Sequence, residues 1–466
     1  MEEAERPRGG MVALAASRLA FALSGTIVNL AMARALVREE FGVFRWVSAV
    51  VALATFGSNL GLGAFVTQRA AREPARVPKL VPAALRATLL LSSATLLLVV
   101  AYVALRDPRP AVLVCGLLAG VGLGVQAMSQ VVEGALHGLH HTRAEVPSVL
   151  VGRALLVVGS LALLAAGFGL VAQFAVRLIA AAVAWGMLVL ALRRVSGGLD
   201  WAHPEPPVRD LVAAGRVFGA TVLFGAIYAQ ADVLMIEALV SDAEVARYGA
   251  PSSVLLQLAL VSNVVTRSFF PRLAAHPDRA RELLRLQTRV LLTAGVPVAA
   301  GGLAVASRLV PALFGDPYVD SVLPFQILVC VVPIRFLNNG YGLALTALDQ
   351  QGRRARIDGL AATFNVLANL IAVPWAGAVG AAATTLLTDA LLLVLLRWQL
   401  SEAAGGLREL DLVVRAALGA VIMAGLVALS GLSLPAQIAL GVAVWGLVVP
   451  GAGLLRRESL RELRHI

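Results

Sequence analysis

Long apolar stretches separated by short polar segments follow one another along almost the whole chain. A helix that crosses a bilayer needs roughly 20 mostly apolar residues, because the hydrocarbon core is about 30 Å thick. By that criterion the chain contains about fourteen candidate spans. They cover approximately residues 11–33, 43–66, 80–105, 110–136, 146–166, 168–192, 214–238, 248–271, 286–315, 319–347, 357–375, 376–396, 412–431 and 433–455. The pattern predicts an all-α polytopic membrane protein.

The composition supports this fold class and excludes two others. Of the 466 residues, 59% are hydrophobic and 14% are charged, whereas soluble proteins have roughly 45–50% apolar and about 25% charged residues. A soluble enzyme and a disordered chain are therefore excluded. Cys115 and Cys330 both lie in apolar stretches, so we expect neither a disulfide framework nor a cysteine metal site. The sequence has no phosphate-binding GxxxxGK[ST] loop, and we expect no cofactor.

The basic residues predict how the chain is oriented. Short cytoplasmic loops are enriched in Lys and Arg. With both termini in the cytoplasm, 23 of the 39 basic residues fall in inner segments and six fall in outer loops. We therefore expect an even number of spans and cytoplasmic termini. In a membrane protein the net charge of +11 reflects this bias, and no nucleic acid partner is expected.

A polar linker rich in Gly and Pro follows the sixth predicted span and divides the chain. The predicted segments are an N-terminal six-helix lobe (1–198), a linker (199–210), a C-terminal six-helix lobe (211–400) and a two-helix hairpin with a basic amphipathic tail (401–466). The lobes resemble each other, because several equivalent residues lie 204 positions apart. These are Glu40 and Glu244, Phe44 and Tyr248, Ser58 and Ser262, and Asn59 and Asn263. Two similar lobes predict a transporter with a cleft between them.

Charged residues within the predicted spans are mostly arginines. Ten arginines lie there with three acids, Glu133, Asp232 and Asp389. A charge inside a bilayer costs at least about 2.5–3.5 kcal/mol, so the surplus cations need water or an anionic ligand. Arg suits a diphosphate, because its planar guanidinium donates two parallel hydrogen bonds. The candidate ligands are Arg18, Arg153, Arg177, Arg335 and Arg267. The alternative is that their side chains reach the membrane interface.

Amide side chains recur at helical spacing in the same spans. Gln126, Gln130, Glu133 and His137 share one face of the fourth predicted span. Further candidates for substrate binding are Asn29, Asn59 and Asn263. Such residues can line a hydrated cavity and bind sugar hydroxyls. They can equally join neighbouring helices, with about 0.6 kcal/mol per hydrogen bond.

Asp232 and Glu133 are candidates for ion coupling. A buried carboxylate can alternate between protonated and charged forms, so either could bind a proton or a sodium ion. The alternative is that each neutralises a nearby arginine. The spacing of His137, His140 and His141 could hold a metal, but without a cysteine or further acid we expect a solvated loop and no metal site.

Several segments combine acidic, aromatic and glycine residues in a distinctive pattern. Residues 33–72 (ARALVREEFGVFRWVSAVVALATFGSNLGLGAFVTQRAAR) have an acidic residue and aromatic-Gly before the second predicted helix and Gly-Leu-Gly before an Arg-rich loop. In these residues and in residues 230–248, 268–274, 313–328 and 377–396, the chain resembles bacterial polysaccharide flippases of the Wzx type, in the MATE/MOP exporter superfamily. The resemblance covers roughly residues 12–400.

The resemblance implies that an undecaprenyl-diphosphate-linked oligosaccharide moves from the inner to the outer leaflet by alternating access of the two lobes. We expect a monomer in the bacterial inner membrane that contacts lipids and, through ion coupling, protons or sodium. The alternatives are a lipid II flippase and a MATE-type multidrug or cation antiporter. Organic cations require acidic walls, yet the first three predicted spans contain no Asp or Glu. A polysaccharide polymerase would need a large outer loop, and the sequence predicts none.

Overall fold

The computed structural model describes residues 24–403, 410–451 and 453–454, with the backbone alone for residues 213–228, 260, 403 and 410. Within this part of the chain every regular element is a helix. Eleven of the described helices are long and apolar enough to cross a membrane. The predicted all-α polytopic architecture is confirmed.

The chain divides into two compact units, residues 1–234 and 235–466. In the first unit residues 24–35 are helical. The later elements of this unit are α2 (Arg38–Asn59), α3 (Leu62–Arg72), η1 (Pro74–Arg76), α4 (Val77–Arg106), α5 (Pro110–Gly138), η2 (Thr142–Glu145), α6 (Val146–Ala165) and α7 (Leu170–Ser196), followed by α8 (Val208–Leu239), which ends in the second unit.

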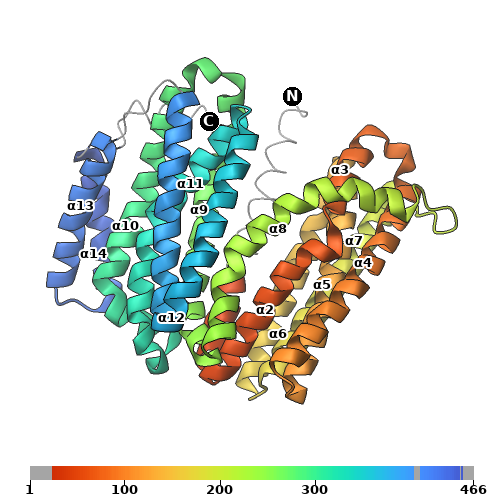
Figure 1. Cartoon of the computed structure of the whole chain (residues 1–466), viewed down its shortest axis with the longest axis horizontal. Coiled ribbons are helices and arrows are strands. Elements are labelled where there is room, and N and C mark those ends of the chain that lie inside the picture. Colours follow the sequence, from red (N-terminus) through yellow and green to blue (C-terminus); the bar gives the residue numbers. More distant parts are fainter. Residues whose placement is uncertain (1–23, 404–409, 452, 455–466) are drawn as a thin grey trace. The chain divides into compact units, whose positions relative to one another are not determined.

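The second unit continues the helical pattern (Figure 1). Its elements are α9 (Asp242–Ala275), η3 (Pro277–Arg279), α10 (Ala280–Phe314), η4 (Asp316–Ser321), α11 (Val322–Ala347), α12 (Gln351–Ala403), α13 (Leu410–Leu429) and α14 (Leu434–Gly451). With the exception of 43–66, the predicted spans that fall on described residues lie largely within helices, and the predicted pair 357–375 and 376–396 forms the kinked α12.

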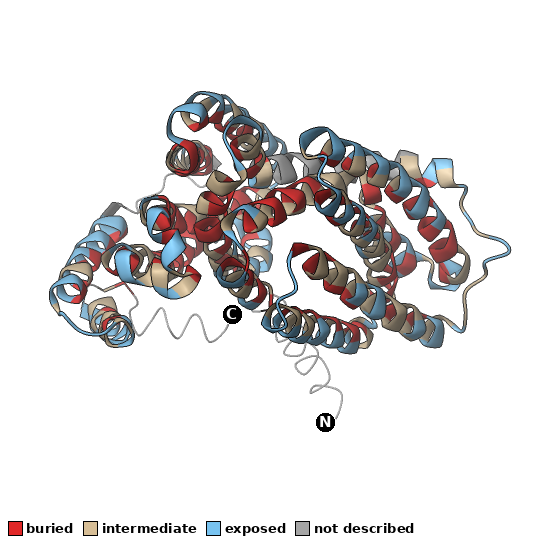
Figure 2. Ribbon diagram, turned by 90° about the horizontal axis from the view of Figure 1, so that it is seen from below, coloured by how far each residue is buried: buried red, intermediate tan, exposed pale blue. Residues whose placement is uncertain are grey.

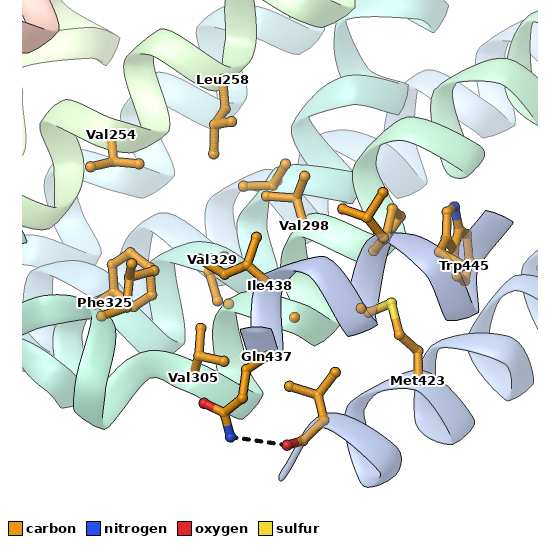
Figure 3. Close-up of a pocket in the computed structure, with 18 of the residues that line it drawn as sticks. Val254, Leu258, Val298, Val305, Phe325, Val329, Met423, Gln437, Ile438 and Trp445 are labelled. Carbon is orange, nitrogen blue, oxygen red and sulfur yellow. Dashed lines mark hydrogen bonds between the residues drawn. The ribbon is translucent and has the colours of Figure 1, made fainter. Parts of the chain in front are cut away.

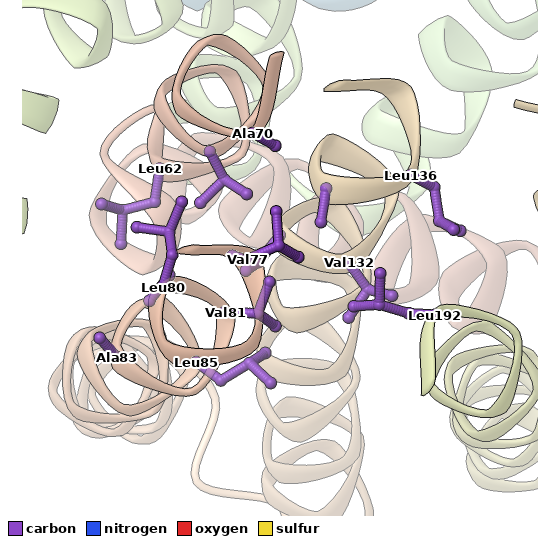
Figure 4. Packing of buried hydrophobic residues seen from close by; sticks show 14 of the residues in the cluster. Leu62, Ala70, Val77, Leu80, Val81, Ala83, Leu85, Val132, Leu136 and Leu192 are labelled. Carbon is purple, nitrogen blue, oxygen red and sulfur yellow. The ribbon is translucent and has the colours of Figure 1, made fainter. Parts of the chain in front are cut away.

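Small residues bring the helices of the first unit close together. Gly116, Gly120 and Gly124 on α5 pack against α4, and a Cβ at Gly120 would collide with Leu96. At the other end of α5, buried side chains of α3, α4, α5 and α7 form an apolar cluster that includes Leu62, Val81 and Leu136 in Figure 4. Close packing of this kind drives helix association in lipid, where burial of apolar surface contributes little. Other faces of the helices carry exposed residues (Figure 2), many of which have large apolar side chains.

The second predicted span is interrupted. The helix α2 ends at Asn59, and Leu60 and Gly61 adopt left-handed conformations with φ of 44° and 77°. Glycine adopts such angles without a steric penalty. The Asn59 Oδ1 atom accepts the Gly63 backbone N–H at 3.2 Å and so helps to begin α3. The equivalent Asn263 lies inside the continuous helix α9.

The segment between α7 and α8 is bound to the start of α4. The Asp200 N–H donates to the Pro78 carbonyl at 2.8 Å, and Arg86 Nη2 donates to the Trp201 carbonyl at 2.6 Å. Backbone N–H groups of His203 and Ala202 donate to the Asp200 carboxylate and lower its pKa. Arg86, one of the arginines in the predicted spans, therefore holds this segment in place.

The two equivalent acids of the repeat make comparable contacts. Glu40 lies beside Gly169, at the start of α7, with its Oε1 atom 3.6 Å from where a Gly169 Cβ would lie. Glu244 accepts the Ala378 N–H at 2.8 Å, at the kink of α12. Each acid thus lies beside a glycine of its own unit, Glu40 at the start of α7 and Glu244 at the kink of α12.

The kink of α12 requires glycine. Gly377 has φ 50° and ψ −128°, which is the Gly-dependent position of a type II′ turn, and a Cβ there would collide with the Glu244 carboxylate. We expect Gly377→Ala to lower the free energy of unfolding by about 1–3 kcal/mol, measured by thermal unfolding in detergent. Gly359→Ala is the matched control, because nothing lies within 4 Å of its Cβ position. Equal stability of the two variants would contradict a glycine requirement.

Candidate functional site

A polar cavity of about 720 Å³ lies inside the first unit. Its walls come from α2, α5, η2, α6 and α7. The polar lining residues are Ser48, Thr55, Gln126, Ser129, Gln130, Glu133, His137, Glu145, Ser148, Arg153 and Arg177. The volume falls within the roughly 300–1,000 Å³ that is typical of ligand pockets. Five of the predicted substrate-binding and ion-coupling residues therefore meet in one cavity: Gln126, Gln130, Glu133, Arg153 and Arg177.

The helix α5 supplies one continuous polar wall. Gln126, Gln130, Glu133 and His137 lie on its cavity face and span about 16 Å along the helix axis, at about 1.5 Å per residue. Asn59 Nδ2 donates to Gln130 Oε1. For Asn59 the structure thus shows the contact between helices that was the alternative to substrate binding, while Gln130 also faces the cavity.

Acidic and basic side chains occupy different parts of this cavity. At one end His137 Nε2 lies 2.7 Å from Glu145 Oε2. Glu133 is within electrostatic reach of both of these residues and of Arg153. Arg153 in turn interacts with Arg177, which also interacts with Arg45 on α2. The cavity is therefore acidic at one end and cationic at the other, with Arg153 between.

Arg177 is half-buried in the wall of this cavity. Its guanidinium carbon lies 4.6 Å from the centre of the Phe44 ring, within the range of a cation–π contact. Its Nη2 atom is 4.0 Å from the Met32 sulfur. Its buried Nε–H has no hydrogen-bond partner among the described residues. A buried donor without a partner is costly, so this guanidinium is suited to an anionic ligand.

Arg335 is paired inside the second unit. Its Nη2 atom lies 2.6 Å from Asp389 Oδ2, with exposed side-chain fractions of 17% and 1%. Asn338 Nδ2 donates to Asp389 Oδ1 at 3.0 Å. The protein therefore compensates the Arg335 charge itself, and sequence reasoning missed the pair because its members are 54 residues apart.

A second, apolar cavity of about 450 Å³ lies in the second unit, between α9, α10, α11, α13 and α14. Figure 3 shows Val254, Val298, Met423 and Trp445 among its lining side chains. Gln437 is the one amide among the described lining residues, and its Nε2 atom donates to the Val427 carbonyl at 3.0 Å. This apolar cavity is suited to a hydrocarbon chain.

Residues 9–276 match the family described as polysaccharide biosynthesis protein. The chain belongs to this family. The match covers the first unit from residue 9 onward and the start of the second unit, and so includes every residue of the polar cavity.

One curated relative is similar to part of the chain. The chain is 30% identical over 170 residues to the "Probable flippase AglR" of Haloferax volcanii, a match that spans 34% of this chain and 35%, about a third, of that relative's length.

Solved structures show the fold. The lipid II flippase MurJ, in an inward closed conformation, has a TM-score of 0.79 at 11% identity, covering 94% of this chain and 97% of that one. A multidrug resistance MATE family transporter of the MOP superfamily, in its inward-facing conformation, has a TM-score of 0.63 at 12% identity, covering 81% and 95%. The chain therefore has the fold of these two proteins.

Other predicted site residues lie outside the polar cavity of this family member. Arg18 falls outside the described residues. Asn29 is half-buried on the helix of residues 24–35, and Asp232 is buried on α8. Asn263 is half-buried and Arg267 is exposed on α9, in the second unit. Sequence reasoning left out Glu145, which lies in η2 between two predicted spans, and Ser148, which lies near the start of α6 within the predicted span 146–166.

Proposed function

We propose that this protein is a flippase, and not an enzyme, that moves an undecaprenyl-diphosphate-linked oligosaccharide from the inner to the outer leaflet for cell-surface polysaccharide synthesis. The observation that carries the proposal is the meeting of Arg153 and Arg177 in one polar cavity of the first unit. Membership of the polysaccharide biosynthesis family supports it, as does the similarity to a probable flippase.

The two arginines hold the diphosphate in this proposal. A guanidinium donates bidentate, charge-assisted hydrogen bonds to phosphate oxygens. Arg153 and Arg177 repel each other, so an anion placed between them relieves this repulsion as well as bonding to both. Arg335, whose charge Asp389 already compensates, is not included. Arg18 and Arg267 remain predictions from the sequence.

The glycan and the lipid chain of the proposed substrate require different chemical surroundings. Amide and hydroxyl groups of Gln126, Gln130 and Ser129 line the polar cavity and can exchange hydrogen bonds with sugar hydroxyls. The apolar cavity beside α13 and α14 offers a place for part of the polyprenyl chain, because its lining is almost wholly hydrocarbon. Each part of the substrate thus meets matching chemistry.

In this proposal the substrate crosses the membrane by alternating access of two lobes. The protein is a monomer in a bacterial inner membrane, and both of its termini lie in the cytoplasm. The membrane potential assists, because an anion that moves out of a negative interior gains about 2.3 kcal/mol per charge per 100 mV. Glu133, in the cavity, and Asp232, buried on α8, are candidates for coupling transport to protons or sodium ions.

A lipid II flippase is the second candidate, favoured by the likeness of fold to MurJ with a TM-score of 0.79. Lipid II also carries a diphosphate, so the arginines do not separate the two functions. A multidrug antiporter for organic cations is disfavoured by the cationic end of the polar cavity.

Reconstitution tests the proposal. Proteoliposomes that contain the protein should flip a fluorescent polyprenyl-diphosphate oligosaccharide at least tenfold faster than protein-free vesicles, followed by its accessibility to an added quencher. Lipid II and a fluorescent organic cation are assayed in the same vesicles. Movement of the organic cation alone would overturn the proposal, and movement of lipid II alone would establish the second candidate.

A further inference from the structure

The acidic end of the polar cavity has no role in binding a diphosphate. It consists of Glu133 on α5, His137 one turn further along, and Glu145 from η2. The Glu145 carboxylate is fixed there, because Oε2 lies 2.7 Å from His137 Nε2 and the backbone carbonyl of Glu145 accepts a hydrogen bond from Ser148 Oγ at 2.6 Å. Two carboxylates therefore face one part of a cavity whose other part is cationic.

The groups that face Glu133 come from only a few elements. They are Glu145 from η2, His137 from its own helix and Arg153 from α6. On the sides of α5 that face α4 and α3, glycines make close contacts: Gly120 meets the Leu96 side chain of α4, and Gly134 meets the Gly63 carbonyl of α3. The charge balance around Glu133 is thus set by one carboxylate, one imidazole and one guanidinium.

Binding of a diphosphate changes this balance. An anion between Arg153 and Arg177 takes hydrogen bonds from Arg153, the cation that faces Glu133. Glu133 and Glu145 then face the neighbouring part of the ligand, with His137 as the remaining basic group among the described residues that interact with Glu133. Carboxylates accept hydrogen bonds from hydroxyl and ammonium groups, whereas like charges placed together are strongly unfavourable.

We propose that Glu133 and Glu145 select the glycan, accepting sugars next to the diphosphate that are neutral or carry an amine and rejecting those that carry a carboxylate. This inference rests on the proposed function, because it needs a diphosphate at Arg153 and Arg177. It names the substrate class of the same cavity: a polyprenyl diphosphate whose first sugars have no acidic group.

The test compares three polyprenyl-diphosphate disaccharides in proteoliposomes: one neutral, one with a free amine and one with a uronic acid next to the diphosphate. The wild-type protein should flip the neutral and amine-bearing compounds at least about tenfold faster than the uronate. Glu133→Gln and Glu145→Gln should each lower this ratio of rates, because each removes one repelling charge. Glu39→Gln, an exposed carboxylate in the first turn of α2, should keep the wild-type ratio.

The outcomes separate this inference from the proposed function. Equal wild-type rates for the neutral and uronate compounds would overturn the selection by carboxylates and leave the flippase in place. A ratio that both glutamine variants leave unchanged would do the same. Failure to flip any of the three compounds would overturn the proposed function itself. The wild-type ratio needs no variant, so the test holds even if Glu145→Gln fails to fold after losing its contact with His137.

Discussion

Replacing Arg153 and Arg177 together by methionine should lower the rate of flipping of a polyprenyl-diphosphate glycan by about 100-fold or more. Each guanidinium can make hydrogen bonds with the diphosphate that are worth about 1.5–3 kcal/mol as charge-assisted contacts, and each 1.4 kcal/mol is a factor of ten. The measurement is the initial rate in proteoliposomes, normalised to the amount of inserted protein. Each single variant should show a smaller loss.

Thermal unfolding of the double variant distinguishes a loss of substrate binding from a loss of folding. Methionine leaves no charge in an enclosed site, so the double variant should unfold at a temperature no lower than that of the wild type. Arg76→Met is the matched control, because that side chain is 72% exposed and pairs with Glu73 outside the cavity. Wild-type flipping by the double variant would show that the headgroup binds elsewhere.

Replacing Arg335 by leucine should lower the free energy of unfolding by about 3–5 kcal/mol. Asp389 is 1% exposed, and removing one partner of a buried pair leaves the other charge in a poor environment. The measurement is unfolding in detergent micelles. A double variant, Arg335→Leu with Asp389→Leu, should recover much of the loss, because it removes both charges.

Arg353→Leu is the matched control for that experiment. Arg353 and Glu402 form an exposed pair, 48% and 53% exposed and 3.9 Å apart, and such pairs contribute about 0–1 kcal/mol. If Arg335→Leu were as stable as the wild type yet flipped no glycan, Arg335 would regain the role of substrate ligand that its position in the sequence predicts.

The spans and the residues of the polar wall could be predicted from the sequence, because both follow from local spacing. Apolar length predicts a span, and the spacing of Gln126, Gln130, Glu133 and His137 predicts one helix face. The cavity that these residues line confirms that they share a surface.

Partners across the fold could not be predicted in this way. Asn59 and Gln130 are 71 residues apart, and Arg335 and Asp389 are 54 apart. Hydropathy predicts how deep such a residue lies in the membrane, but it does not predict which helix packs against it. The break at Leu60 was missed because an apolar stretch that contains Gly61 scores as one uninterrupted span, although glycine permits the left-handed turn.

The glycines of α5 also determine which walls of the polar cavity can adapt. Where backbones touch with no side chains between them, as at Gly63 and Gly134, two helices cannot slide or separate without losing contact, so α3, α4 and α5 should behave as one stiff block. Adjustment to a bulkier cargo then falls on α2, α6 and α7. Selection for larger glycans should accordingly accumulate substitutions at positions such as Ser48, Val149 and Ala181, while the glycine face of α5 stays unchanged.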